Sequence, residues 1–265
     1  MSVLAVIEHD RGTITSASLG VLTAGRSLAK QMGTQLEAVT IGANADALSA
    51  VAAAHGATVT HQAHHAALVD FGPEAWGESL AQVIRATNPQ VVIGTGTERG
   101  HEVIAQAAAR LDLPAAMNCT EFDESFTGAG ALRVVRTRWG GSLMEQAEVD
   151  ASIKLVTLAN HVVEPSESPV AGSTTTHDVT LDASVLHSFV VDRVERVAGV
   201  TLATSPVVVS GGRGVGSAEA FAPLEELAGL LGGVVGCSRA VTNNGWRNHT
   251  DQVDRKSTRL NSSHR

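Results

Sequence analysis

Short apolar runs alternate with amphipathic segments along the first 111 residues. Four runs have the length and composition of buried strands: residues 3–7, 36–41, 58–60 and 91–94. Four intervening segments carry apolar or Ala-rich patterns of helical length: residues 16–32, 45–54, 73–86 and 102–111. Strands that alternate with helices at this spacing predict βαβ units and a parallel sheet.

The pattern changes in the middle of the chain. Segments 132–138 and 142–149 flank Trp139-Gly140-Gly141 and predict a hairpin in which glycine supplies the positive φ of the turn. A further strand is expected at 153–158, and an edge strand at 187–197, where apolar and polar residues partly alternate. The segment 164–182 is rich in Ser, Thr and Pro and is expected to be an exposed loop.

A second α/β unit is predicted after a linker at 200–205. A strand at 206–209 leads into the turn Ser210-Gly211-Gly212-Arg213-Gly214, which a helix at 221–231 follows. Gly232-Gly233 ends that helix, and a new strand begins at Val234. The expected fold class is therefore α/β.

Composition narrows the class of protein. Of the 265 residues 43% are hydrophobic but only 3% aromatic, with no Tyr, so the core must consist of Ala, Val, Leu and Ile. A net charge of −8 argues against a nucleic-acid or membrane-surface binder. No apolar run is long enough for membrane insertion, and the start of the chain lacks a signal-peptide pattern. Cys119 and Cys237 form neither a disulfide framework nor a metal-ligand pair, so a cytoplasmic protein is expected.

Glycine-rich turns are the main candidates for ligand binding. Residues 94–100 join a strand to a helix, and this segment is either a phosphate-binding turn or a tight turn that needs small residues. In the second unit, Gly211 and Gly212 allow close backbone approach, and Arg213 offers a guanidinium suited to a phosphate or pyrophosphate. The alternative there is a structural turn with an exposed arginine. Ser238 and Arg239 follow the next strand, at the same end of the sheet if both strands are parallel.

Other reactive residues are expected to be structural. His61, His64 and His65 lie together in sequence without a nearby carboxylate, which favours a solvated loop over a metal site. His9-Asp10 is expected to form a structural turn, and Cys237 to fill space in the core. No catalytic constellation or metal motif is present in the sequence, so we expect no catalytic residues and no metal.

The last twelve residues differ from the rest of the chain. The string DRKSTRLNSSH at 254–264 is the translation of a widely used short-read sequencing adapter, and Arg265 would be its next codon. The segment is either a solvated basic tail or foreign to the protein. We expect residues 254–265 to be a non-native tail and the natural chain to continue beyond Val253.

Several spaced blocks resemble the alpha subunit of electron-transfer flavoproteins. They are the opening SVLAVIEHDRG, then PVVVSGGRG, Phe221, LEELA, GCSRA, Gly245-Trp246 and Asp251-Gln252-Val253. This resemblance implies an N-terminal α/β domain facing a beta subunit, residues 1–203. It also implies a doubly wound FAD-binding domain at 204–253, incomplete here.

The resemblance also implies a cofactor site. It assigns FAD binding to Gly211, Gly212, Arg213, Ser238, Arg239, Gln252 and Val253. Arg213 would contact the flavin or pyrophosphate, and Arg239 would stabilise negative charge on the reduced flavin. The family continues Gln-Val with Gly-Gln-Thr-Gly, whereas this chain continues with Asp254-Arg255-Lys256, so we expect the chain as it stands not to retain FAD.

The implied function is that of an electron carrier rather than a substrate-converting enzyme. It would accept electrons from flavin dehydrogenases, such as those acting on acyl-CoA in fatty acid β-oxidation, and pass them to a quinone oxidoreductase or another acceptor. Its partner would be the beta subunit, which can hold AMP. Two alternatives stay open: a non-redox nucleotide-binding regulatory module with its site at 94–100, and a flavin- or NAD-dependent enzyme. The missing acid/base constellation weighs against the enzyme.

Overall fold

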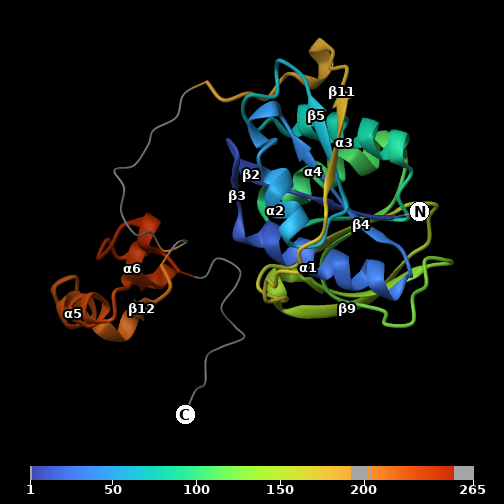
Figure 1. Ribbon diagram of the computed structural model, residues 1–265. Helices are drawn as coiled ribbons and strands as arrows, with labels where there is room; N and C mark the ends of the chain where they lie inside the picture. Colours follow the sequence, from blue (N-terminus) through green and yellow to red (C-terminus); the bar gives the residue numbers. More distant parts are fainter. Residues whose placement is uncertain (1, 192–201, 203–204, 254–265) are drawn as a thin grey trace. The chain divides into compact units, whose positions relative to one another are not determined.

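The computed structural model describes residues 2–191, 202 and 205–253 (Figure 1). Its contacts divide the chain into two compact units, Met1–Asp192 and Arg193–Arg265. Both units are α/β, as the strand and helix patterns predicted.

Unit 1 is built on a nine-stranded sheet in the order β11-β5-β4-β1-β6-β10-β7-β8-β9. The strands from β11 to β7 pair in parallel, and the last two pairings are antiparallel. The parallel strands are β1 (Ser2–Val6), β4 (Gln35–Ile41), β5 (Val59–His64), β6 (Val91–Thr95), β7 (Ala115–Phe122), β10 (Lys154–Leu158) and β11 (Ser173–Asp178). The antiparallel part is the hairpin of β8 (Leu132–Arg138) and β9 (Leu143–Val149). The parallel sheet and the hairpin were both predicted.

Helices cover both faces of this sheet (Figure 1). Helices α1 (Ser16–Gln31) and α2 (Leu48–Ala54) pack on one face, and α3 (Pro73–Thr87) and α4 (Glu98–Leu111) on the other. The buried residues are mainly Val, Ala, Leu and Ile, as the scarcity of aromatic residues requires. A two-stranded turn of β2 (His9–Asp10) and β3 (Thr13–Ile14) follows β1.

Several expectations for unit 1 were wrong. Strand β7 was missed because its sequence AAMNCTEF mixes polar and apolar residues without alternation. Strand β11 lies inside the expected exposed loop; its residues STTTHD are almost all exposed, so they carry no hydrophobic signal. The helix expected at 45–54 begins only at Leu48, as α2, and a 3₁₀ turn, η1 (Ala43–Ala45), precedes it. Residues 187–191 form no strand, and 192–197 lie outside the described residues.

Local chemistry explains two element boundaries. Helix α4 begins four residues earlier than expected because the Thr97 side chain caps it, accepting a hydrogen bond from the Gly100 N–H at 2.9 Å. In the hairpin turn η2 (Trp139–Gly141), Gly141 has φ +86°, as expected, but Trp139 also has a positive φ of +53°. A bulky residue in this region is an outlier.

Unit 2 holds a small parallel sheet of β12 (Val208–Gly211) and β13 (Val234–Cys237). Between them lie η4 (Arg213–Val215), η5 (Glu219–Phe221) and α5 (Ala222–Leu230); α6 (Arg239–Asn243) and η6 (His249–Asp251) follow β13. Buried Phe221, Cys237 and Val241 form its core. The expected linker 200–205 lies largely outside the described residues. Within the described parts of both units, no helix combines the length and apolar character that a bilayer span requires.

Candidate functional site

The two predicted binding segments of unit 2 meet at one edge of the sheet. Gly211 ends β12 and Ser238 follows β13, and because these strands are parallel both segments leave from their carboxyl ends. The Ser238 backbone N–H donates to the Gly211 carbonyl oxygen at 3.0 Å. The structure therefore brings Gly211, Gly212 and Arg213 together with Ser238 and Arg239, although 24 residues lie between Arg213 and Ser238 in sequence.

The glycines of this edge have different roles. A Cβ at Gly211 would lie 2.6 Å from the ring of Phe221, so close packing requires glycine there. A Cβ at Gly212 would meet only Ser238 Oγ at 3.8 Å, and one at Gly214 would meet nothing within 4 Å. The backbone at Gly212–Gly214 is thus open to a ligand.

Arg213 and Arg239 are exposed, and Ser238 is half-buried. Within the described residues their side chains form no hydrogen bond or ion pair, and Ser238 starts α6 without a side-chain cap. Arg247 differs from these arginines, since it pairs with Glu225 at 2.6 Å and with Asp251 at 3.2 Å. The guanidinium groups of Arg213 and Arg239 and the Ser238 hydroxyl therefore lie at one sheet edge as hydrogen-bond donors that suit a diphosphate.

Gln252 and Val253 lie beside β13. Gln252 forms a parallel bridge with Cys237, and the Val253 N–H donates to the Cys237 carbonyl oxygen at 2.9 Å. The Gln252 Oε1 accepts a hydrogen bond from Thr242 Oγ1 at 3.3 Å. Both residues thus extend the small sheet, and their contact with a flavin stays a prediction. Residues 254–256, where the family pattern is expected to be lost, lie outside the described residues.

The two cysteines are buried. Neither Cys119 nor Cys237 has measurable exposure. Burial raises the pKa of both thiols, that of Cys119 to about 12. A protonated, inaccessible thiol is a poor nucleophile, so the interpretation of Cys237 as a core residue holds.

The glycine-rich turn 94–100 of unit 1 is occupied by the protein's own carboxylate. The buried Glu8 accepts hydrogen bonds from the hydroxyls of Thr95 and Thr97, beside the first turn of α4. A Cβ at Gly96 would clash with the Leu158 carbonyl, and one at Gly100 with Thr95. These glycines therefore serve packing, and the anionic Glu8 disfavours a phosphate at this helix N-terminus.

The solvated loop expected for the histidines was wrong for two of them. His61 and His64 lie on β5; His61 is buried and contacts Glu37 Oε2 through Nε2 at 3.0 Å, and His64 contacts Asp46 at 2.8 Å. Sequence reasoning missed these partners because they come from β4 and the turn after it. Within the described ranges, no group of three metal-ligating side chains could hold a metal ion.

His9 also has a structural environment, as expected. Its Nε2 lies 2.9 Å from the Ile41 carbonyl oxygen, and its ring lies 4.9 Å from that of Trp76. Burial lowers the pKa of His9, so the ring is neutral near pH 7 and suits a packed position.

Comparison with known proteins covers both units. The profile described as "Electron transfer flavoprotein domain" matches residues 3–184, and "Electron transfer flavoprotein FAD-binding domain" matches residues 201–263. The second match includes the whole candidate site and runs into the expected non-native tail.

Curated relatives are similar along most of the chain. Protein FixB of Azorhizobium caulinodans is 30% identical, over 93% of this chain and 69% of its own length. The electron transfer flavoprotein subunit alpha of Thermoanaerobacterium thermosaccharolyticum is 28% identical, over 93% of this chain and 75% of its own. The probable mitochondrial alpha subunit of Caenorhabditis elegans is 30% identical, over 95% and 73%. Members of this family carry electrons rather than convert a substrate. The profiles and relatives together show that this chain belongs to the electron transfer flavoprotein family, as an alpha subunit.

Proposed function

We propose that the chain is the FAD-binding alpha subunit of a heterodimeric electron carrier. The observation that supports this most directly is the meeting of Gly211–Arg213 with Ser238–Arg239 at the carboxyl edge of a parallel sheet. Ligands of open α/β sheets bind at such edges, outside the carboxyl ends of the strands. The same residues fall inside the FAD-binding profile.

The donor set at this edge fits FAD. The open backbone at Gly212 and Gly214 leaves room for a diphosphate, and the exposed Arg213 and Arg239 can neutralise its charge. Ser238 can donate its hydroxyl to a phosphate or ring oxygen, because that hydroxyl caps no helix. When bound, FAD would supply the redox chemistry, while the chain holds it and sets its electrostatic environment.

The proposed role implies electron donors, electron acceptors and a partner subunit. We propose that the heterodimer accepts electrons from flavin dehydrogenases, such as acyl-CoA dehydrogenases, and passes them to a quinone oxidoreductase or another acceptor. The beta subunit would complete the dimer and can hold AMP. The carrier would work in the cytoplasm. The net charge of −8 suits a diffusing carrier that does not adhere to nucleic acid.

We further propose the domain boundaries expected from the sequence: residues 1–203, residues 204–253 and a non-native tail at 254–265. On this basis the 265-residue chain binds FAD weakly, because Gly-Gln-Thr-Gly does not follow Val253. Genomic DNA read past the Val253 codon is expected to encode Gly-Gln-Thr-Gly in frame. DNA that encodes Asp-Arg-Lys at this place instead would contradict the proposed tail.

Expression together with the beta subunit of the same organism tests the function. The chain encoded by the genomic DNA is expected to form a yellow heterodimer with one FAD, which an acyl-CoA dehydrogenase and its substrate reduce. A colourless or unpaired product would contradict the proposal. The non-redox alternative predicts instead AMP or ATP binding to unit 1, which Glu8 beside α4 disfavours.

A further inference from the structure

Arg247 joins three short elements of unit 2. Its side chain is 19% exposed, and it pairs with Glu225 of α5 at 2.6 Å and with Asp251 of η6 at 3.2 Å. Its guanidinium carbon lies 5.3 Å from the centre of the Phe221 ring, at the end of η5. One guanidinium group therefore contacts η5, α5 and η6 at once.

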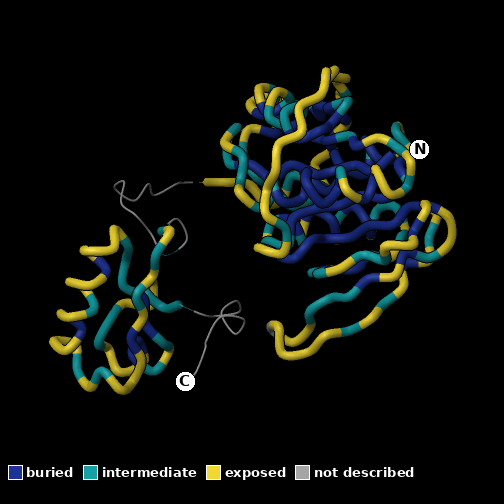
Figure 2. The backbone as a smooth tube through the Cα atoms, turned by 60° about the horizontal axis from the view of Figure 1, so that its bottom comes forward, coloured by how far each residue is buried: buried dark blue, intermediate teal, exposed yellow. Residues whose placement is uncertain are grey.

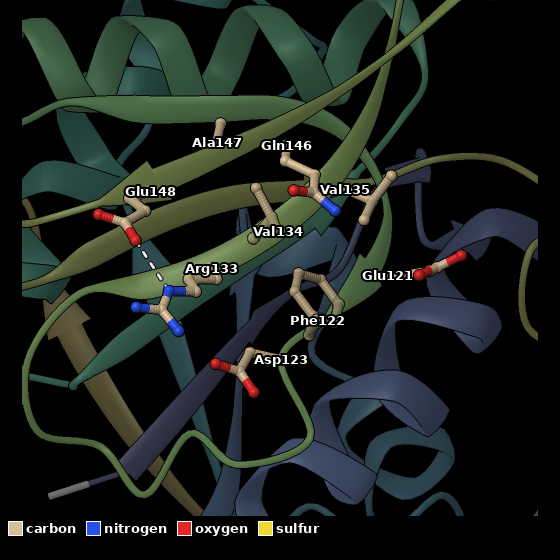
Figure 3. A pocket seen from close by; sticks show the side chains of 9 residues that line it. All are labelled: Glu121, Phe122, Asp123, Arg133, Val134, Val135, Gln146, Ala147 and Glu148. Carbon is tan, nitrogen blue, oxygen red and sulfur yellow. Dashed lines mark hydrogen bonds and ion pairs between the residues drawn. The ribbon is translucent and has the colours of Figure 1, made fainter.

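The ion pair between Arg133 and Glu148 on unit 1 shows the contrast (Figure 3). It joins two strands of one hairpin at 2.8 Å, and its side chains are 71% and 58% exposed. An exposed pair of this kind contributes little to stability, because water and salt screen the charges. Arg247 is mostly shielded from water and also faces an aromatic ring, so the removal of its guanidinium is expected to have a larger effect.

The Phe221 ring connects Arg247 to the glycine turn after β12. Phe221 is fully buried and forms the small core of unit 2 with Cys237 and Val241. The same ring would lie 2.6 Å from a Cβ at Gly211, so it packs directly on the backbone where the turn begins. Figure 2 shows that the buried stretches of unit 2 are short, and the position of the turn therefore depends on the contacts of this ring.

Asp251 connects Arg247 to the second segment of the proposed cofactor site. It directly precedes Gln252, whose backbone pairs with the end of β13. Thr242 Oγ1 lies 3.3 Å from Gln252 Oε1 and 3.0 Å from the carbonyl oxygen of Arg239, at the start of α6. The ion pair with Arg247 therefore holds the segment that contacts both the end of β13 and α6.

We propose that Arg247 is a positioning residue for FAD: through Phe221 and Asp251 it fixes the glycine turn after β12 relative to Gln252 and Val253. The inference rests on the proposed FAD site. The guanidinium of Arg247 is already engaged by two carboxylates and a ring, so it acts through its neighbours rather than on the cofactor. A site whose parts are held in the bound arrangement binds its ligand more tightly, because less conformational freedom is lost on binding.

Arg247→Met tests this role in the heterodimer of the complete natural chain and the beta subunit. Methionine keeps a long apolar side chain beside Phe221 but removes the guanidinium. We expect the dissociation constant for FAD, measured by titration of the heterodimer stripped of FAD, to rise about tenfold. At saturating FAD, the absorption bands of the bound flavin are expected to shift towards those of free FAD, because the two segments no longer hold one arrangement around it.

Asp251→Ala isolates one of the contacts of Arg247. We expect it to raise the dissociation constant for FAD about threefold. The double variant is expected to bind FAD as Arg247→Met alone does, because both changes remove the same contact. A loss in the double variant equal to the product of the two single losses would overturn the inference, and so would wild-type affinity in Asp251→Ala. If Arg247→Met does not assemble, Asp251→Ala carries the test by its affinity and its flavin bands.

Ala228→Gly is the matched control for lost stability. Ala228 is buried in α5, and glycine there lowers the stability of the helix while the three contacts of Arg247 stay in place. We expect a lower urea midpoint with wild-type flavin bands at saturating FAD. Bands that shift in Ala228→Gly as they do in Arg247→Met would show that they follow stability, and this result would overturn the inference.

The outcomes separate this inference from the proposed function. A wild-type heterodimer that holds no FAD overturns both. A wild-type heterodimer that holds FAD, with Arg247→Met at the same affinity and with the same bands, overturns only the positioning role. Weaker binding with wild-type bands in Arg247→Met would assign Arg247 to stability alone and would likewise overturn it.

Discussion

His61 Nδ1 lies 3.0 Å from His177 Nε2, which joins β5 to the edge strand β11. Through its other nitrogen His61 contacts Glu37 on β4, also at 3.0 Å. The contacting side chains of Glu37, His61 and His177 thus link three neighbouring strands. Only one proton fits between the two facing nitrogens, so protonation of both rings would set two N–H groups against each other.

Acid is expected to destabilise unit 1 through His177. Burial and the nearby charge of His61 lower the pKa of His177, so the unfolded chain binds its proton more readily. The contribution of neutral His177 to the free energy of unfolding is therefore fully present above the ordinary histidine pKa of about 6.5. It is lost as the pH falls from there through the lowered pKa. His177→Gln is expected to flatten this dependence, measured as urea midpoints between about pH 8 and about pH 5.

Glu37 is expected to cause a second loss of stability at lower pH. The hydrogen bond from His61 lowers the pKa of Glu37, so its contribution is present above the ordinary carboxyl pKa and is lost as the pH falls through the lowered value. His161→Asn serves as a control, because His161 is exposed and its positive φ of +61° suits asparagine. A pH profile that His177→Gln leaves as steep as the wild type would show that the histidine contact does not titrate.

A second prediction concerns Glu8. Its carboxylate accepts hydrogen bonds from Thr95 and Thr97 in a buried position, so Glu8→Ala removes the acceptor of both hydroxyls and leaves them their 3.1 Å contact with each other. We expect a loss of about 2 kcal/mol in the free energy of unfolding, measured by urea titration. Thr97→Ala, which removes the cap of α4, is expected to cost about 1 kcal/mol, and Thr97→Ser to cost less. An unchanged midpoint for Glu8→Ala would contradict a structural role for this carboxylate.

Particular residues show which strands and contacts the hydrophobic pattern could predict and which it could not. Buried strands such as β1 and β6 are short apolar runs and were predicted. Strand β11 is polar because solvent covers its side chains, and it is held by backbone pairing with β5, which no local pattern reveals. His61 and Glu37 are 24 residues apart in sequence and meet only because β4 and β5 are neighbours.

The edge of unit 2 was more predictable. Two local patterns were visible in the sequence: adjacent glycines after one strand, and Ser238 and Arg239 after the next. Because the two strands pair in parallel, these segments meet at one edge of the sheet. The requirement for glycine at position 211 was not predictable, because the Phe221 ring that excludes a Cβ there lies ten residues later in sequence. The same holds for Glu8, which fills the turn 94–100 from the end of β1.

Gly100→Ala is a third prediction. A Cβ at this position would clash with both the hydroxyl and the carbonyl oxygen of Thr95. We expect a loss of about 2 kcal/mol or more, measured by urea titration of unit 1. Because a backbone oxygen is involved, adding Thr95→Ala is expected not to restore stability. Recovery in the double variant would show that the side chain alone causes the clash.

The last prediction concerns electron transfer itself. Arg239 is exposed, has no partner within the described residues and follows β13 at the proposed flavin site. A positive charge there favours the reduced, more negative flavin, so Arg239→Ala in the complete heterodimer is expected to lower the first reduction potential. Loss of about 1.4 kcal/mol of charge stabilisation corresponds to about 60 mV for one electron, which potentiometric titration resolves.

Two further variants separate charge from binding in this experiment. Arg239→Lys keeps the positive charge and is expected to retain most of the potential, although it loses the planar guanidinium. Arg213→Ala is expected to weaken FAD binding more than it shifts the potential, if Arg213 neutralises the diphosphate. An Arg239→Ala heterodimer that holds FAD at the wild-type potential would remove Arg239 from the flavin's electrostatic environment, because a charge near the ring cannot be deleted without changing the energy of its reduction.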